Sequence, residues 1–245
     1  MAKKGRFVVV DGIDGAGKGV FLDTFVEEAR KDGKRVFDVH EFWKEHDYHP
    51  PVSGFIGRFD VIVTSEPTFV GIGRYIRGEL VAKHNRMYSP EAIAEAYALD
   101  RRILYQQLLL PALNTGIDVY QSRSFSSSIV YQKQSALDEG RDFSVRDILS
   151  IPGNAFCYSH PMDFLVIPTI VDVREALRRA EQREKDDKCR FEDLAFQIRI
   201  KAHYESNDFQ MVFTEVGTEI VYLDAGRTLE RSQEQAREFY QLKLK

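Results

Sequence analysis

The chain has 245 residues, of which 43% are hydrophobic and 29% charged, and its formal net charge is −4. These values are typical of a folded globular protein and exclude a disordered chain. The acidic balance argues against nucleic acid as a partner. No run of apolar residues approaches the roughly 20 needed to cross a bilayer, so we expect no membrane partner. The two cysteines, Cys157 and Cys189, lack a metal-ligand spacing and favour a reduced, cytoplasmic setting.

A strand, a glycine-rich loop and a helix open the chain. Residues 7–10 form a short apolar run rich in β-branched side chains, which predicts a buried parallel strand. Residues 20–31 carry apolar side chains at helical spacing, and Gly33 follows as a stop signal. With a second strand predicted at residues 35–39, this opening is a βαβ unit.

The glycine-rich loop at residues 12–18 matches the pattern G-x-x-x-x-G-K. In this pattern, backbone N–H groups cradle phosphate oxygens, the following helix adds its positive N-terminal end, and the lysine reaches the β- and γ-phosphates. Its position after a strand and before a helix therefore predicts an ATP site. The residues expected to bind ATP are Gly12, Ile13, Asp14, Gly15, Ala16, Gly17, Lys18 and Gly19.

The residue after the lysine departs from the usual pattern. Gly19 stands where a serine or threonine hydroxyl normally binds Mg²⁺. We expect Mg²⁺ with ATP, held by water or by a nearby carboxylate, because Mg²⁺ often keeps several waters and few protein ligands. Asp11 and Asp14 are the nearest candidates in sequence, although Asp11 could instead only brace the loop.

Strands and helices continue to alternate after the loop. Further strands are predicted at residues 59–64, 117–121, 164–167 and 220–223. Further helices are predicted at residues 90–113, 126–137, 144–149, 173–183, 194–204 and 229–242. This alternation predicts a single α/β domain over residues 1–245, of the P-loop NTPase-like three-layer α/β/α type, with a central parallel sheet of about five strands.

Five segments, in order along the chain, resemble motifs of the thymidylate kinase family of P-loop nucleoside monophosphate kinases. They are the loop at residues 11–18, the segment Thr64-Ser65-Glu66-Pro67 with residues 73–77, residues 96–101, Ser122-Arg123-Ser124 with residues 127–132, and a charged segment at about residues 181–192. The resemblance implies ATP-dependent phosphorylation of a deoxynucleoside monophosphate, with dTMP as the leading acceptor. It also implies a homodimer, and a mobile lid at about residues 181–192.

The resemblance assigns binding of the acceptor nucleotide to two pairs of side chains. Tyr97 and Arg101 lie one helical turn apart and are expected to stack on thymine and to donate to its carbonyl. Alternatively, they are a core tyrosine and a surface arginine. Arg77 and Arg123 are expected to bind the acceptor 5′-phosphate, since guanidinium groups contact phosphate at two points.

Catalysis is assigned to the loop and to the lid. Lys18 and Arg123, with the lid residues Arg183 and Arg190, are expected to stabilise the charge of the transferring phosphoryl group. The resemblance also puts Asp14 and Glu66 near the sugar and the metal; Glu66 could equally form a local salt bridge.

Three positions and one segment differ from the family pattern. Besides Gly19, Ser65 replaces an arginine and Ser122 replaces an aspartate. These changes leave open a different nucleotide or nucleoside acceptor, or a nucleotide-binding regulatory protein with little kinase activity. Residues 41–58 look like an insertion. Its aromatic side chains either pack a loop onto the core, which we favour, or shape the acceptor pocket or a partner surface; they are Trp43, Tyr48 and Phe55.

Overall fold

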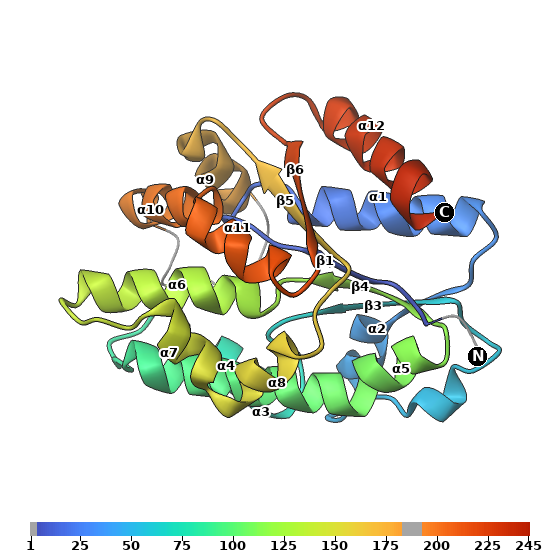
Figure 1. Cartoon of the computed structure of the whole chain (residues 1–245), viewed down its shortest axis with the longest axis horizontal. Coiled ribbons are helices and arrows are strands. Elements are labelled where there is room, and N and C mark those ends of the chain that lie inside the picture. Colours follow the sequence, from blue (N-terminus) through green and yellow to red (C-terminus); the bar gives the residue numbers. More distant parts are fainter. Residues whose placement is uncertain (1–3, 183–192) are drawn as a thin grey trace.

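A six-stranded parallel sheet forms the centre of the molecule in the computed structural model, which describes residues 4–182 and 193–245 (Figure 1). The strand order is β2-β3-β4-β1-β5-β6. The strands are β1 (Phe7–Val10), β2 (Val36–Asp38), β3 (Val61–Ser65), β4 (Asp118–Ser122), β5 (Phe164–Thr169) and β6 (Glu219–Asp224). All six segments predicted as strands are present, so the sheet is slightly wider than the expected five or so.

Helices follow the strands in the predicted alternation. Their bounds are α1 (Lys18–Lys31), α2 (Val39–Glu45), α3 (Gly71–Tyr75), α4 (Pro90–Leu104), α5 (Leu110–Asn114), α6 (Phe125–Asp138), α7 (Val145–Ser150), α8 (Pro152–Tyr158), α9 (Val173–Glu181), α10 (Leu194–Tyr204), α11 (Asn207–Thr214) and α12 (Leu229–Phe239). Within the described residues, one 3₁₀ turn and three π-helical segments join or extend them: η1 (Val52–Gly54), η2 (Ile76–Leu80), η3 (Tyr105–Leu109) and η4 (Tyr240–Leu244). The long helix predicted at residues 90–113 corresponds to α4, η3 and α5 in succession.

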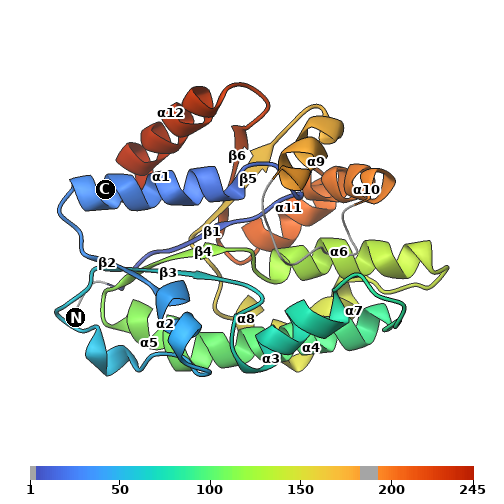
Figure 2. The ribbon, with the colours of Figure 1, turned by 180° about the vertical axis from the view of Figure 1, so that it is seen from behind.

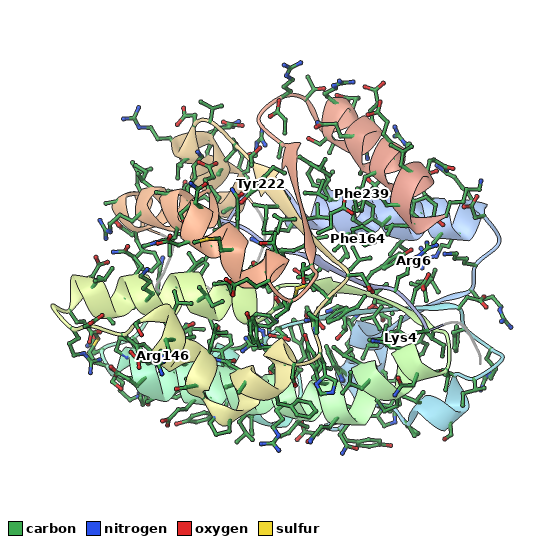
Figure 3. The ribbon with its side chains drawn as sticks, in the orientation of Figure 1. Lys4, Arg6, Arg146, Phe164, Tyr222 and Phe239 are labelled. Atoms are coloured by element: carbon green, nitrogen blue, oxygen red, sulfur yellow. The ribbon has the colours of Figure 1, made fainter. Side chains whose placement is uncertain are left out.

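Helices cover both faces of the sheet. Helices α1 and α12 lie together on one face, and α4, α5 and α8 lie on the other, in both views of the ribbon (Figures 1 and 2). Alternate residues of β1 divide accordingly, since side chains alternate across a strand: Val8 and Val10 belong to the core beneath α1 and α12, and Phe7 and Val9 to the core beneath α4. Between β5 and α12, the rings of Phe164 and Phe239 meet edge to face, 5.6 Å apart (Figure 3).

The irregular segment at residues 41–58 packs against the core. Trp43 is 2% exposed and Phe55 5% exposed, whereas Tyr48 is 57% exposed. Part of this segment belongs to α2, whose N-cap, Asp38, accepts a hydrogen bond from the His40 backbone N–H. The interpretation that its aromatic side chains pack onto the core is confirmed for Trp43 and Phe55.

Four helices of the structure have no counterpart in the sequence-based prediction: α2, α3, α8 and α11. Helix α8 begins with Pro152-Gly153-Asn154, a composition typical of turns. A Cβ on Gly153 would lie 2.0 Å from the Ala98 carbonyl oxygen, so this glycine lets α8 approach α4 closely. Helix α11 is capped by Ser206, which precedes two further polar residues that suggest a loop. In the described part of the chain, no helix is both long and apolar enough to cross a membrane.

Candidate active site

The phosphate loop joins β1 to α1 at the carboxyl edge of the sheet. Its three glycines have positive φ angles: 140° at Gly12, 76° at Gly15 and 87° at Gly17. Residues with a Cβ rarely adopt such angles, so the spacing of the glycines sets the path of the loop. Gly17 is the N-cap of α1, so the positive end of this helix is at the loop, where phosphate binds in proteins of this kind.

Lys18 folds back over the loop. Its Nζ donates to the carbonyl oxygens of Gly12, at 3.0 Å, and Ile13, at 2.8 Å. Asp14 Oδ1 lies 3.6 Å from the same nitrogen. The ammonium thus sits within the loop that the sequence predicts to hold phosphate.

Asp11 is fully buried beneath the loop and accepts hydrogen bonds at both carboxylate oxygens. Its donors come from three parts of the chain: the Gly12 N–H at 2.8 Å, the hydroxyls of Ser126 and Ser127 on α6, and the Tyr204 hydroxyl at the end of α10, at 3.1 Å. Such a carboxylate braces the loop against α6 and α10. The geometry therefore favours the bracing role over the metal-binding role for Asp11.

Asp14 and Arg123 form an ion pair at the mouth of the loop. The Arg123 guanidinium donates to Asp14 Oδ1, and Gln197 Nε2 donates to Asp14 Oδ2 at 3.3 Å. Burial disfavours the charged guanidinium, but the nearby carboxylates outweigh this effect and raise the pKa of Arg123 well above its usual value. Arg123 has a φ of 66°, a strained backbone for an arginine, and such strain is typical of functional sites. The fold thus brings together two predicted site residues that lie 109 positions apart in the sequence.

Arg101 lies inside the protein, with 1% of its surface exposed. Its Nε donates to Glu66 Oε2 at 2.6 Å, and its terminal nitrogens donate to Asn154 Oδ1 and, at 3.1 Å, to Ser128 Oγ. Burial raises the pKa of Glu66 to about 7, although the Arg101 charge acts in the opposite direction. The predicted base-binding arginine is thus held by three protein acceptors, and Glu66 forms a buried ion pair. Tyr97, one turn earlier on α4, is partly buried.

Arg77 lies beside the segment that follows β3. Its Nε donates to the Pro67 carbonyl at 3.1 Å and to the Thr68 carbonyl at 3.2 Å, and its guanidinium carbon is 3.8 Å from the centre of the Phe69 ring. Asp100 fixes the same segment, because it accepts from the backbone N–H and the hydroxyl of Thr68 at 2.8 and 2.7 Å. The Glu66–Pro67 peptide bond is cis. Arg77 and Phe69 therefore form an aromatic–cation pair on an ordered loop.

The sequence did not predict a hydrogen-bonded chain of Asp38, His40 and Ser65. His40 Nδ1 lies 2.6 Å from Asp38 Oδ1, and His40 Nε2 lies 2.8 Å from Ser65 Oγ. The sequence marks Ser65 only as the residue that stands where the family pattern has an arginine. His40 could not be linked to it because 25 residues separate the two in sequence.

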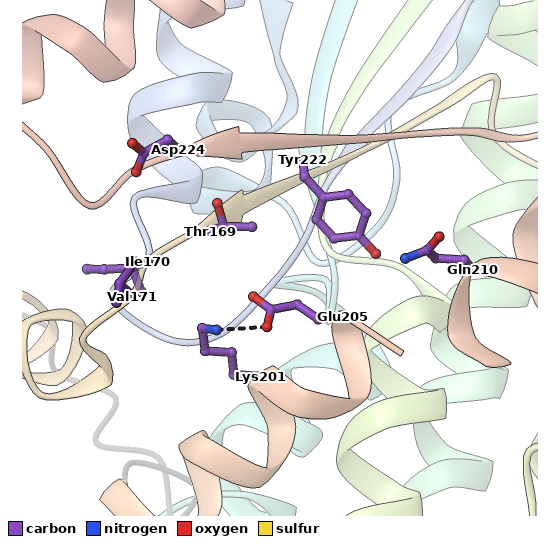
Figure 4. A pocket seen from close by; sticks show the side chains of 8 residues that line it. All are labelled: Thr169, Ile170, Val171, Lys201, Glu205, Gln210, Tyr222 and Asp224. Carbon is purple, nitrogen blue, oxygen red and sulfur yellow. Dashed lines mark hydrogen bonds and ion pairs between the residues drawn. The ribbon is translucent and has the colours of Figure 1, made fainter. Parts of the chain in front are cut away.

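A cavity of about 340 Å³ adjoins the phosphate loop. It is bordered by the loop, the start of α1, the end of α9 and the segment between β6 and α12; its lining includes Gly15, Gly17, Val20, Arg179, Thr228 and Ser232. A second cavity, of about 420 Å³, lies between the ends of β5 and β6 and helices α10 and α11 (Figure 4). There Lys201 and Glu205 form an ion pair at 2.7 Å. The first cavity is continuous with the predicted ATP site.

Carboxylates that could bind a metal are few at the loop. Within residues 4–182 and 193–245, no cluster of three or more metal-ligating side chains occurs. Asp14 is partly exposed, at 20% of its side chain, and a carboxylate suits Mg²⁺, which takes most of its ligands from water and phosphate. Asp14 therefore fits a metal that arrives with a nucleotide better than Asp11 does. The predicted lid arginines, Arg183 and Arg190, lie outside the described residues.

Comparison with known proteins identifies one family. The thymidylate kinase family model matches residues 56–236. A thymidylate kinase of Exiguobacterium sp. is 25% identical over 235 residues, which cover 96% of this chain and 93% of that protein. A thymidylate kinase of Halothermothrix orenii is 28% identical over 82% of this chain and 83% of its own length. A probable thymidylate kinase of Pyrococcus abyssi is 31% identical over 74% of this chain and 72% of its own length.

Proposed function

Because this chain belongs to the thymidylate kinase family and is a nucleoside monophosphate kinase, we propose that it transfers the γ-phosphoryl group of ATP to dTMP. The observation that carries the proposal is the phosphate loop with the Asp14–Arg123 pair at its mouth. This arrangement puts a donor-phosphate cradle beside a cation suited to an acceptor phosphate.

The cavity next to the loop supports ATP as the donor. It continues from Gly15 and Gly17 to Arg179 and Thr228, so a nucleotide whose phosphates enter the loop would extend its nucleoside into this space. Arg179 already donates to the Ala225 carbonyl at 2.8 Å, which holds α9 against the segment after β6. We assign the adenosine end of ATP to this cavity.

Arg77, Arg123 and Tyr97 support a monophosphate acceptor. The two guanidinium groups would bind its phosphate, and the Tyr97 ring would stack on its base. Arg101 and Glu66 fix the wall of this region through their buried ion pair. Since Arg101 already has three protein acceptors, a different nucleotide acceptor is a second candidate, because base discrimination would then differ from that of the relatives.

The chemistry asks the protein to position groups and to stabilise charge. The acceptor phosphate oxygen attacks the γ-phosphorus in line, and little covalent chemistry falls to the protein. Lys18 and the loop N–H groups would bind the donor phosphates, and Arg123 would hold the acceptor. Mg²⁺, held by Asp14 and by water, would supply charge neutralisation at the phosphates. We also propose that Arg183 and Arg190, which lie outside the described residues, supply further positive charge to the transferring group, and that the single kinase domain forms a cytoplasmic homodimer.

A panel of acceptors tests the proposal. Purified protein is incubated with Mg²⁺, ATP and each of dTMP, dUMP, dCMP, dGMP, dAMP and thymidine, and ADP release is measured. We expect turnover with dTMP well above that with the other acceptors, and no turnover in Lys18→Ala with any of them. Preference for another nucleotide would select the second candidate. ATP binding without transfer to any acceptor would identify a nucleotide-binding regulatory protein instead.

A further inference from the structure

The ring of His40 is held at both of its nitrogens. Asp38 Oδ1 lies 2.6 Å from Nδ1 and also accepts from the His40 backbone N–H at 2.9 Å, while Ser65 Oγ lies 2.8 Å from Nε2. Two elements supply these groups: Asp38 ends β2 and caps α2, and Ser65 ends β3. The hydrogen-bonded chain therefore crosses between neighbouring strands at the carboxyl edge of the sheet.

This chain lies beside the proposed acceptor region. Ser65 is in register with Ser122 of β4, the residue before Arg123, and it is followed directly by Glu66. The rings of His40 and Phe69 form a T-shaped pair, at 5.6 Å between centroids, and the Arg77 guanidinium lies over the Phe69 ring. His40 and Arg77 thus border the same aromatic ring, which is 42% exposed.

The chemistry of the chain depends on the charge of the imidazole. In the neutral form with the proton on Nδ1, the Ser65 hydroxyl donates to Nε2, so its proton is not available to a ligand. In the imidazolium form, both ring nitrogens donate, so Ser65 Oγ accepts from His40 and its own proton is free to donate elsewhere. Asp38, on the opposite ring nitrogen, fixes the orientation of the ring.

We propose that His40 and Ser65, oriented by Asp38, bind the phosphate of the acceptor nucleotide, and that this pair takes the place of an arginine at position 65. A phosphate monoester would accept the Ser65 hydroxyl proton, while Ser65 Oγ accepts a hydrogen bond from His40 Nε2–H. The inference rests on the proposed function, because it concerns the acceptor of that reaction. The pair would then determine specificity, because it contacts the phosphate of a nucleoside monophosphate and makes no contact with a nucleoside that lacks one.

A purely structural role for His40 would have a different consequence. Helix α2 is anchored by Val39 and Trp43, which are 0% and 2% exposed, whereas the His40 side chain is 27% exposed. If His40 only tied α2 to β3, its loss would disturb the neighbouring site as a whole. Nucleoside and nucleotide would then be weakened alike.

The test compares binding of dTMP and of thymidine by calorimetry in the full-length protein. In His40→Ala and in Ser65→Ala, we expect dTMP to bind about tenfold or more weakly, the loss of one hydrogen bond to a charged group. Thymidine binding and the KM for ATP should stay within about twofold of wild type, since neither involves this pair. His46→Ala is the matched control, because His46 lies at the other end of α2 and stacks on Phe42.

A rescue variant adds a second readout. His40→Ala combined with Ser65→Arg should recover most of the lost dTMP affinity, because the arginine restores a phosphate-binding cation. Equal weakening of dTMP and thymidine, or unchanged dTMP binding in His40→Ala, would overturn this inference alone. Wild-type protein that bound neither dTMP nor another nucleoside monophosphate in the same assay would overturn the proposed function, and this inference with it.

Discussion

Two substitutions of Gly19, to serine and to alanine, can together separate metal binding from helix stability. A Cβ at this position would have Asp23 Oδ2 as its nearest neighbour, 3.9 Å away, so a serine fits without a clash. We expect Gly19→Ser to lower the Mg²⁺ concentration needed for half-maximal activity several-fold, because it restores a hydroxyl ligand next to Lys18. It should also stabilise α1 by about 0.5 kcal/mol, since glycine is a poor helix former.

Gly19→Ala is the control for this substitution. Alanine stabilises the helix but offers no oxygen to the metal, so it should raise the thermal midpoint without shifting the Mg²⁺ dependence of ADP release. An equal shift in Mg²⁺ dependence for both variants would contradict the role given to the hydroxyl.

Single residues also show how far sequence reasoning reaches. The path of the loop through Lys18 and the glycines was predictable, because the glycine spacing alone sets it. The burial of Arg101 was not, because its acceptors Asn154 and Ser128 lie 53 and 27 positions away and nothing in the sequence pairs them. Asp11 illustrates a middle case: the sequence allows two roles, and only the packing of α6 and α10 against it favours one of them.

At the scale of elements, α9 packs directly on the phosphate loop. A Cβ added to Gly15 would lie 1.7 Å from the Ala176 carbonyl oxygen in α9. We expect Gly15→Ala to force the helix and the loop apart. It should lower the free energy of unfolding by more than about 2 kcal/mol, beyond the usual penalty of a positive φ, and weaken ATP binding at least tenfold. Urea unfolding and calorimetric ATP titration measure the two effects.

Gly217 provides the matched control for the close approach. Its φ is 85°, near the 76° of Gly15, but a Cβ there would meet nothing within 4 Å. Gly217→Ala should therefore show only the backbone penalty, about 1–2 kcal/mol, with ATP binding unchanged. Comparable losses in both variants would mean that the contact between α9 and the loop is unimportant.

The elements themselves were largely predictable, for a physical reason. Helix α1 carries apolar side chains at helical spacing, and β1 is a short apolar run; both patterns survive in the fold. Helix α8 carries none: it exists because Gly153 lets it lie on α4, a contact made across the molecule. Local patterns cannot reveal an element that is stabilised by its neighbours.

At the scale of the whole molecule, burial of His49 ties stability to pH. Its ring meets Trp43 at 5.6 Å between centroids, and its buried Nδ1 has no hydrogen-bond partner among the residues that the structure describes. Burial lowers the pKa of His49 to about 4. Between pH 6.5 and 4, His49 binds a proton in the unfolded chain but not in the folded protein. The free energy of unfolding therefore falls as the pH falls, by at most about 3 kcal/mol.

His49→Phe keeps the aromatic ring and removes this titration. We expect the difference in unfolding free energy between variant and wild type to move in favour of the variant as the pH is lowered from about 7 to about 4.5. Urea unfolding at several pH values measures it. A difference that does not change with pH would show that His49 titrates alike in the folded and the unfolded chain.

The order of the strands is the part of the fold that the sequence does not carry. Alternating elements predicted a parallel sheet, but the order β2-β3-β4-β1-β5-β6 depends on which crossover passes over which face. That order brings the end of β3 beside the end of β4, and so Ser65 beside Ser122. The proposed acceptor region is therefore a product of topology, while the phosphate loop is a product of local sequence.

The hydrogen bonds from Lys18 Nζ to the carbonyl oxygens of Gly12 and Ile13 have a thermodynamic consequence. The ammonium cross-links the loop from within, and the brace at Asp11 holds it from below. A phosphate that binds here exchanges partners with an already shaped loop, so little conformational entropy is lost on association. Nucleotide affinity at this site should then reflect mainly the enthalpy of exchanged hydrogen bonds, because the ordering of the backbone has been completed during folding.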